Sequence, residues 1–293
     1  MNALYEILSP DFLLRDALLA SLLVGLVCPL VGVYFVLRRM VFLGVALPQV
    51  SSAGIAISFF LYSYLVGQHQ HYQMGEGVVA MLGSFTFTLA AMLVLAFFAR
   101  RRETVEARIG TTYAIAAAAT MLFLALDPHG EAQMVHLLRG DMLAINGTNL
   151  GWMAGILGAV ALALFAFRRE LLIVSFDRDL AVVFGKRAGL WDLVLYLLIG
   201  LVISLGVMTA GPLATFGFLV VPPVTVRLFA GRMLTFVAGS SILGAACAFL
   251  GFYCAYVLDL PLGPAEVAVA SAALGIAGAF IGVRRLVRGW RRR

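Results

Sequence analysis

The sequence predicts an all-α integral membrane protein with about eight membrane-spanning helices and one further segment that is broken or re-entrant. Of its 293 residues, 62% are hydrophobic and only 12% are charged, and the mean hydropathy is +1.01. Soluble globular proteins carry about 25% charged residues, so a bilayer must solvate most of this apolar surface. The apolar residues form runs long enough to cross a membrane as helices, and basic residues gather between alternate runs.

The spanning helices are predicted from continuous apolar runs, because a helix satisfies its own backbone polar groups within the hydrocarbon. These runs occupy residues 16–37, 41–66, 77–99, 109–126, 147–167, 190–209, 233–258 and 264–283. A further segment, 212–229, begins at Pro212 directly after Gly211 and contains Pro222-Pro223. Helical hydrogen bonds are therefore expected to be lost at two sites. Transporters place their pathways at such discontinuous helices, and this segment is therefore a candidate lining of a substrate path.

The basic residues define the orientation. If the runs cross alternately and the broken segment returns the chain, all of the 21 Lys and Arg residues except Arg15 and Arg139 fall on one side. The positive-inside rule makes that side cytoplasmic. The N-terminus is then outside, and residues 284–293 form a basic cytoplasmic tail. The net charge of +6 thus reflects topology, and no nucleic-acid partner is predicted. Because no basic segment precedes the first run, we expect that run to be a retained span.

The outer loops are acidic and contain all four histidines. His69, His71, His129 and His136 are weak candidates for metal ligands, since imidazole suits transition metals. The alternative is that these loops lack Lys and Arg because of topology alone. The pair His69 and His71 has no third ligand nearby in the sequence.

Polar residues within the spans are few. In the second run, Pro48, Gln49, Ser51 and Ser52 form a polar kink that either lines a substrate path or joins neighbouring helices. Thr215 in the broken segment is a further pathway candidate. Glu266, about one turn into the last run, is expected to cap that helix.

A cytoplasmic stretch at 170–187 is predicted to contain a short helix, which Asp177 caps and Gly185 ends. Its apolar residues Leu180, Val183 and Phe184 recur at helical spacing. They are expected to face either the bilayer surface or a protein partner.

Four segments in order resemble one family over nearly the full length. They are Leu37-Arg-Arg-Met-Val-Phe-Leu-Gly44, the 169–177 stretch, the 211–227 segment and Asp259-Leu-Pro-Leu-Gly-Pro264. They resemble permease subunits of the ABC-3 family, bacterial importers of zinc, manganese or iron. The 211–227 segment also resembles permeases for vitamin B12 and iron siderophores.

The resemblance implies one transmembrane permease domain over 1–293, of the vitamin B12/metal-permease type, in the bacterial inner membrane. It also implies a homodimer, a cytoplasmic ABC ATPase dimer and an extracytoplasmic solute-binding protein. Residues 175–187 would form the coupling helix, and the residues expected to contact the ATPase are Asp177, Asp179, Leu180, Val183, Phe184 and Gly185. The chain has no GxxxxGK[ST] phosphate loop, so we expect the partner to use ATP and this chain to bind no cofactor.

The sequence departs from the family in the second span. Metal permeases there resemble Gly-Asp-x-x-Ser-His, whereas this chain has Val45 for the Asp, Pro48 for the Ser and Gln49 for the His. Valine cannot bind a metal, and an amide oxygen is a poor zinc ligand. Either the cation is held elsewhere, or the cargo is a chelate, or the permease is non-standard.

Two other classes remain as alternatives to a metal importer of the ABC type. An ion-coupled secondary transporter would use buried carboxylates, which are scarce here. An ABC permease for a metal chelate such as a siderophore fits the altered second span. An intramembrane enzyme is disfavoured, because no GxSxG, HExxH or paired membrane-depth carboxylates occur.

Overall fold

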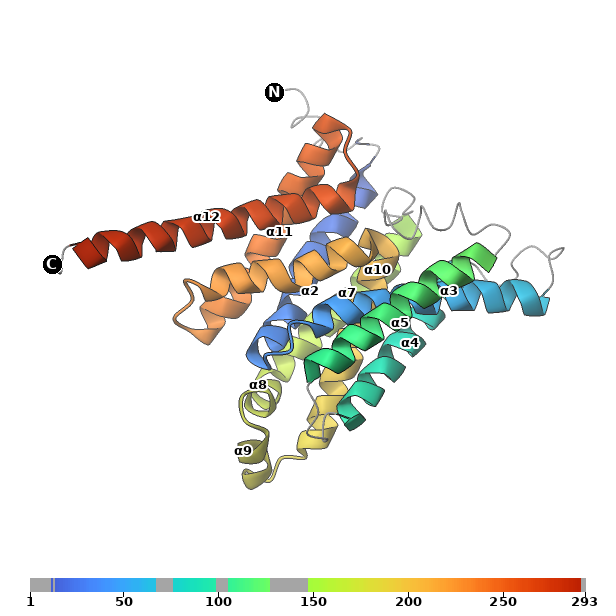
Figure 1. Ribbon diagram of the computed structural model, residues 1–293, viewed down its shortest axis with the longest axis horizontal. Coiled ribbons are helices and arrows are strands. Elements are labelled where there is room, and N and C mark those ends of the chain that lie inside the picture. Colours follow the sequence, from blue (N-terminus) through green and yellow to red (C-terminus); the bar gives the residue numbers. More distant parts are fainter. Residues whose placement is uncertain (1–11, 13, 67–75, 99–104, 127–146, 291–293) are drawn as a thin grey trace.

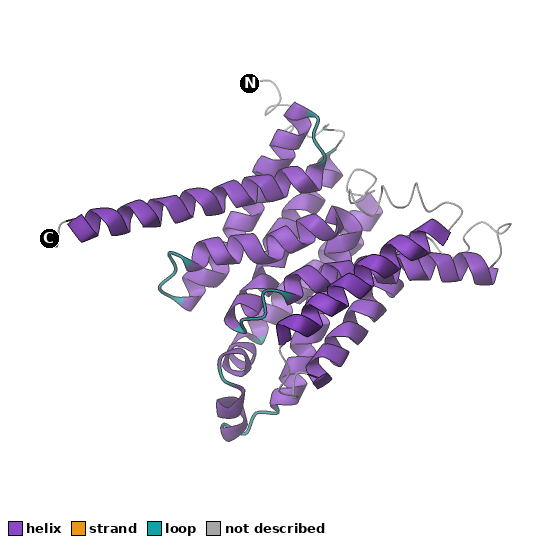
Figure 2. Cartoon of the chain, in the orientation of Figure 1, coloured by secondary structure: helices purple, strands orange, loops and turns teal. Residues whose placement is uncertain are grey.

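The computed structural model describes residues 12, 14–66, 76–98, 105–126 and 147–290, and its regular structure there is helical (Figures 1 and 2). The helices are α2 (Arg15–Leu37), α3 (Leu43–Val66), α4 (Glu76–Phe98), α5 (Val105–Leu126), α7 (Gly147–Ala166), α8 (Arg168–Phe176), α9 (Arg178–Val183), α10 (Ala188–Arg227), α11 (Met233–Leu258) and α12 (Leu262–Trp290).

Eight of these helices are long and apolar enough to cross a membrane, which confirms the predicted all-α membrane fold. Their bounds agree with the apolar runs to within a few residues, apart from α10 and α12. α10 joins the sixth run to the broken segment. α12 continues to Trp290, so residues 284–290 of the predicted basic tail are a continuation of the last helix. Residues 291–293 lie outside the described part of the chain.

α10 changes direction at Gly211, where the backbone leaves the helical region with φ 79° and ψ 167° (Figure 1). This conformation is available essentially only to glycine. The predicted loss of backbone donors at Pro222-Pro223 holds, since proline has no N–H, but the segment is not broken there because the helix continues to Arg227. Pro223 cannot donate to the carbonyl of Leu219. That carbonyl instead packs against Gly32 of α2, where an added Cβ would lie 1.9 Å from its oxygen.

α2 is at the centre of the bundle. It packs against α10 and α11, while α3 packs between α4 and α5, and α12 covers α10 and α11. In the most apolar window of α2, 72% of residues are buried, against 22% in α5 and α7 and 17% in α12. The outer helices therefore present broad apolar faces, as membrane helices in contact with lipid must.

In the stretch at 170–187, the predicted short helix is α9, and a further short helix, α8, precedes it. α8 ends at Phe176, Asp177 lies in extended conformation between the helices, and α9 follows. The expected end at Gly185 is confirmed. Gly185 has φ 70°, and the N–H of Lys186 donates to the carbonyl of Ala181 over 3.0 Å.

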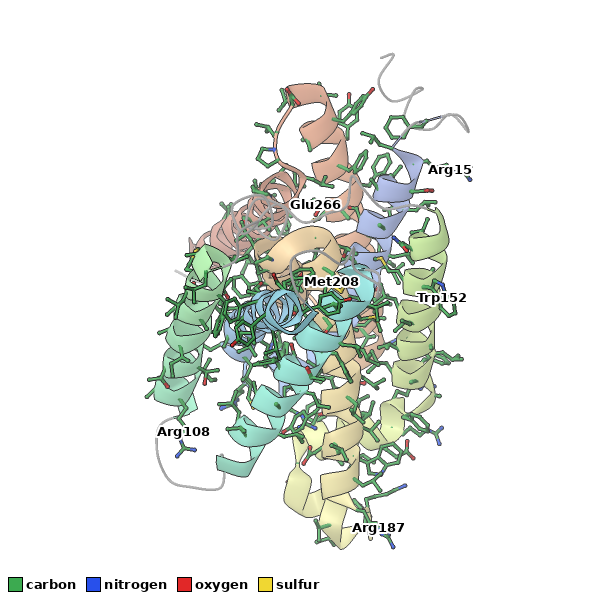
Figure 3. The ribbon with its side chains drawn as sticks, turned by 90° about the vertical axis from the view of Figure 1, so that its right-hand side faces the viewer. Arg15, Arg108, Trp152, Arg187, Met208 and Glu266 are labelled. Atoms are coloured by element: carbon green, nitrogen blue, oxygen red, sulfur yellow. The ribbon has the colours of Figure 1, made fainter. Side chains whose placement is uncertain are left out.

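Basic residues on different helices lie at the same end of the bundle. In Figure 3, Arg108 and Arg187 lie at one end and Arg15 lies at the other. This arrangement agrees with the predicted alternation of crossings. That the basic end is cytoplasmic remains a prediction from charge.

Candidate functional site

The hydroxyls of the polar kink in α3 make contacts within the protein. Ser51 is fully buried, and its Oγ lies 2.5 Å from the Oγ of Ser84 on α4. The Oγ of Ser52 donates to the carbonyl of Pro48 over 3.1 Å. Both hydroxyls are thus bonded within the protein, Ser51 to α4 and Ser52 to its own helix, and a pathway role for them stays a prediction.

Gln49 is half-buried and points toward α5. Its Nε2 lies 3.5 Å from the Oγ1 of Thr120, which itself donates to the carbonyl of Ala116 over 2.8 Å. Val45, one turn earlier on α3, is also half-buried. The two positions where the sequence departs from the metal-permease pattern therefore share one helix face, and neither carries an ionisable group.

Thr215 lies immediately after the bend in α10. It is fully buried, and its Oγ1 donates to the carbonyl of Gly211 over 2.8 Å. An added Cβ on Gly206 would lie 2.9 Å from its methyl group. Thr215 thus stabilises the bend by contacting both halves of α10. The structure places Gln49 against α5 and Thr215 against α10 itself.

Glu266 occupies an unexpected environment. Its side chain on α12 is fully buried against α2 and α11, between the levels of Arg15 and Met208 in Figure 3. One carboxylate oxygen accepts a hydrogen bond from Ser21, and the other has no partner among the described residues. Neither oxygen caps α12, so the expected capping role is wrong. The sequence did indicate an unusual position for Glu266, since an acidic residue one turn inside an apolar membrane span is energetically costly.

Residues 175–187, the predicted coupling helix and below called the coupling stretch, expose apolar side chains near their end. Val183 is 81% exposed and Phe184 is 66% exposed, while Ala181 faces inward. The side chains of Asp179 and Leu180 lie outside the described part. Glu170 at the start of α8 lies 3.4 Å from the Nζ of Lys186. A hydrogen bond from its own backbone, with a smaller contribution from Lys186, lowers the pKa of Glu170.

A buried guanidinium behind the coupling stretch was missed by sequence reasoning. Arg38, just after α2, pairs with Asp192 of α10 over 2.8 Å and donates from Nε to the Oγ of Ser175 in α8 over 3.1 Å. Its Cζ lies 5.8 Å from the ring centroid of Tyr196. Asp192 offered a signal, because it is an acid within the first turns of a span at the basic end.

The histidines expected as weak metal ligands lie outside the described residues. Those four are His69, His71, His129 and His136. Within the described ranges, no group of three or more His, Cys, Asp or Glu side chains could hold a metal ion. The three cysteines are free thiols, with Cys28 and Cys247 buried and Cys254 partly buried. This agrees with packing roles for them.

Eight helices long and apolar enough to span a membrane, one of them bent at Gly211, are the architecture of a multi-pass membrane protein. Residues 11–281 match the ABC 3 transport family, so the chain belongs to that family. It is 28% identical over 269 residues to the manganese transport system membrane protein MntC of Listeria monocytogenes, covering 91% of this chain and 90% of that protein. It is 25% identical over 270 residues to the manganese import system permease protein ScaB of Streptococcus gordonii, and the match covers 92% of this chain and 91% of that protein.

A solved structure shares the fold over nearly the whole length. The structure of PsaBC from Streptococcus pneumoniae in complex with Fab superposes with a TM-score of 0.78 and 25% sequence identity. The match covers 92% of this chain and 91% of that one. The sequence-based recognition of an ABC-3 permease is thereby confirmed.

Proposed function

We propose that this permease imports a divalent metal cation, manganese, zinc or iron, across the bacterial plasma membrane. The observation that carries the proposal is the match over about nine-tenths of the chain to relatives named for manganese transport. The alternating arrangement of basic helix ends supports an outward N-terminus and a cytoplasmic C-terminus.

Transport would depend on three partners. Two copies of the permease would enclose one pathway, and an extracytoplasmic binding protein would deliver the cargo. A cytoplasmic ATPase dimer would bind the coupling stretch and supply the energy. The exposure of Val183 and Phe184 supports a protein contact there, because large apolar side chains at a polar end of the bundle are otherwise unfavourable.

The coupling contact is tested by charge substitution at Phe184. We expect Phe184→Glu to abolish co-purification of the ATPase while the permease stays folded, because a carboxylate cannot enter an apolar groove without a desolvation cost. Phe229→Glu is the matched control, since Phe229 is 54% exposed and lies outside the coupling stretch. Equal ATPase recovery with both variants would contradict the docking assignment.

The substrate is tested in proteoliposomes that contain the permease, the ATPase and the binding protein. We expect ATP-dependent uptake of Mn²⁺, Zn²⁺ or Fe²⁺. Uptake driven by a proton gradient without the ATPase would instead support an ion-coupled secondary transporter. Each cation is supplied both free and chelated in the same assay.

A chelated cargo is the second candidate, and one observation favours it. The described residues of α3 present neutral groups at Val45 and Gln49, and no ligand cluster appears elsewhere in the described ranges. A chelate brings its own ligands and needs only shape and hydrogen bonds from the pathway. Uptake of the chelate alone would decide for this alternative.

A further inference from the structure

Three helices meet at the guanidinium of Arg38. The charged group lies at the end of α2, the hydroxyl of Ser175 comes from α8, and the carboxylate of Asp192 comes from the first turns of α10. The side chains of Arg38 and Asp192 are only 11% and 14% exposed. A charge pair this shielded from water interacts more strongly than an exposed one, so it holds the three helices in one geometry.

Ser175 connects this junction to the coupling stretch. It is buried, it lies two residues before Asp177, and α9 begins at Arg178. Val174 of α8, Ala181 of α9 and Ala188 of α10 also pack in one apolar cluster. A displacement of α9 by a bound partner would therefore move the hydroxyl that Arg38 holds.

The second half of α10 reaches the same end of α2. Nη1 of Arg227, in the last turn of α10, donates to the carbonyl of Val36 over 3.2 Å. Val36 is two residues before Arg38. Both ends of the broken helix are thus tied to one turn of α2, the first through Asp192 and the second through Arg227.

We propose that Arg38 is a positioning residue that transmits movement of the ATPase-docking helices α8 and α9 to α2 and to both halves of the broken helix α10. This inference rests on the proposed coupling to an ATPase. Arg38 acts by fixing the relative positions of Ser175 and Asp192.

The chemistry of the junction suits a transmitting role better than a purely stabilising one. A complete buried ion pair can often be replaced by apolar residues with little loss of stability, so stability alone does not require a charged pair at this junction. The Nη2 atom of Arg38 is buried without a hydrogen-bond partner among the described residues. A guanidinium with an unused donor can gain or exchange a partner when its neighbours shift, and an ammonium lacks the planar fork that reaches two partners at once.

The test uses the complete complex of permease, ATPase and binding protein in proteoliposomes, with Mn²⁺ as the probe. Ser175→Ala removes only the bond to α8, and Arg38→Lys keeps the charge but removes the fork. We expect each variant to bind the ATPase normally and to hydrolyse ATP, while cation uptake per ATP falls about fivefold or more, the scale of a typical coupling energy. Arg39→Asn is the matched control, because Arg39 is exposed and has φ 56°, which asparagine tolerates.

The outcomes distinguish a failure of the transmitting role of Arg38 from a failure of the proposed function. Uptake per ATP that is unchanged in both Ser175→Ala and Arg38→Lys overturns the transmitting role. A variant that loses thermal stability and total uptake together, while its uptake per ATP stays at the wild-type value, also overturns the transmitting role. That result is expected of a bond that only stabilises the structure. If the wild-type complex shows no ATPase binding and no ATP-dependent uptake, the proposed function fails, and this inference fails with it.

Discussion

Replacement of Gly32 by alanine tests how closely α2 and the second half of α10 pack. The added Cβ would lie 1.9 Å from the carbonyl oxygen of Leu219, 2.8 Å from its carbon and 3.0 Å from Cγ of Pro223. Real Cβ contacts essentially never fall under 3.0 Å, so the helices must separate by about 1 Å. The clash is with backbone and a proline ring, neither of which can rotate away.

The size of the expected destabilisation follows from the helix packing that this separation weakens. Overpacking of a filled interior costs about 1–3 kcal/mol. We therefore expect Gly32→Ala to lower the free energy of unfolding by about 1–3 kcal/mol relative to a glycine-to-alanine change without a clash.

Gly151→Ala supplies that reference. Gly151 lies in α7, where an added Cβ meets nothing within 4 Å, so both variants gain the same helix propensity and only one gains a clash. Equilibrium unfolding of each variant in a mild detergent titrated with dodecyl sulfate gives the two free energies. If Gly32→Ala is within about 0.5 kcal/mol of Gly151→Ala, the close approach of α2 and α10 is wrong.

Three further changes test separate features. Gly211→Ala should cost about 1–3 kcal/mol in the same unfolding assay, because alanine strains a backbone at φ 79°; stability equal to that of Gly151→Ala would contradict the bend. Ser21→Ala should lower the free energy of unfolding by about 1–3 kcal/mol, because it leaves the buried carboxyl group of Glu266 without its donor. An unchanged unfolding midpoint would show that this contact does not stabilise the protein. Gln49→His should change the cation selectivity of uptake, and an identical selectivity profile would remove Gln49 from the pathway.

The spanning helices could be predicted from the sequence because hydropathy over about 20 residues is a strong, local signal. The bend at Gly211 was equally local, since Gly-Pro punctuates a helix. The continuity of α10 through Pro222-Pro223 was not predictable. The carbonyl of Leu219 that Pro223 leaves without a donor faces Gly32, far away in the chain, and the missing side chain of Gly32 lets α2 approach it.

The junction at Arg38 could not be predicted for the same reason. Arg38 and Ser175 are 137 positions apart, and Ser21 and Glu266 are 245 positions apart. A sequence shows which charges exist and on which side they fall, but pairing is decided by how helices pack. The pathway residues predicted from α3 remain predictions, since the described contacts of Ser51 and Ser52 are internal.

The neutral character of α3 also bears on which metal is carried. Oxygen ligands such as amides, hydroxyls and carbonyls suit Mn²⁺ better than Zn²⁺, which prefers imidazole and thiolate. At Val45 and Gln49 the chain lacks the carboxylate and imidazole of the metal permeases it resembles, and Gln49 keeps only an amide. Among bare cations, therefore, Mn²⁺ uptake should exceed Zn²⁺ uptake in the same proteoliposomes. A preference for free Zn²⁺ would show that nitrogen or sulfur ligands outside α3 hold the ion, and His69, His71, His129 and His136 would be the first to examine.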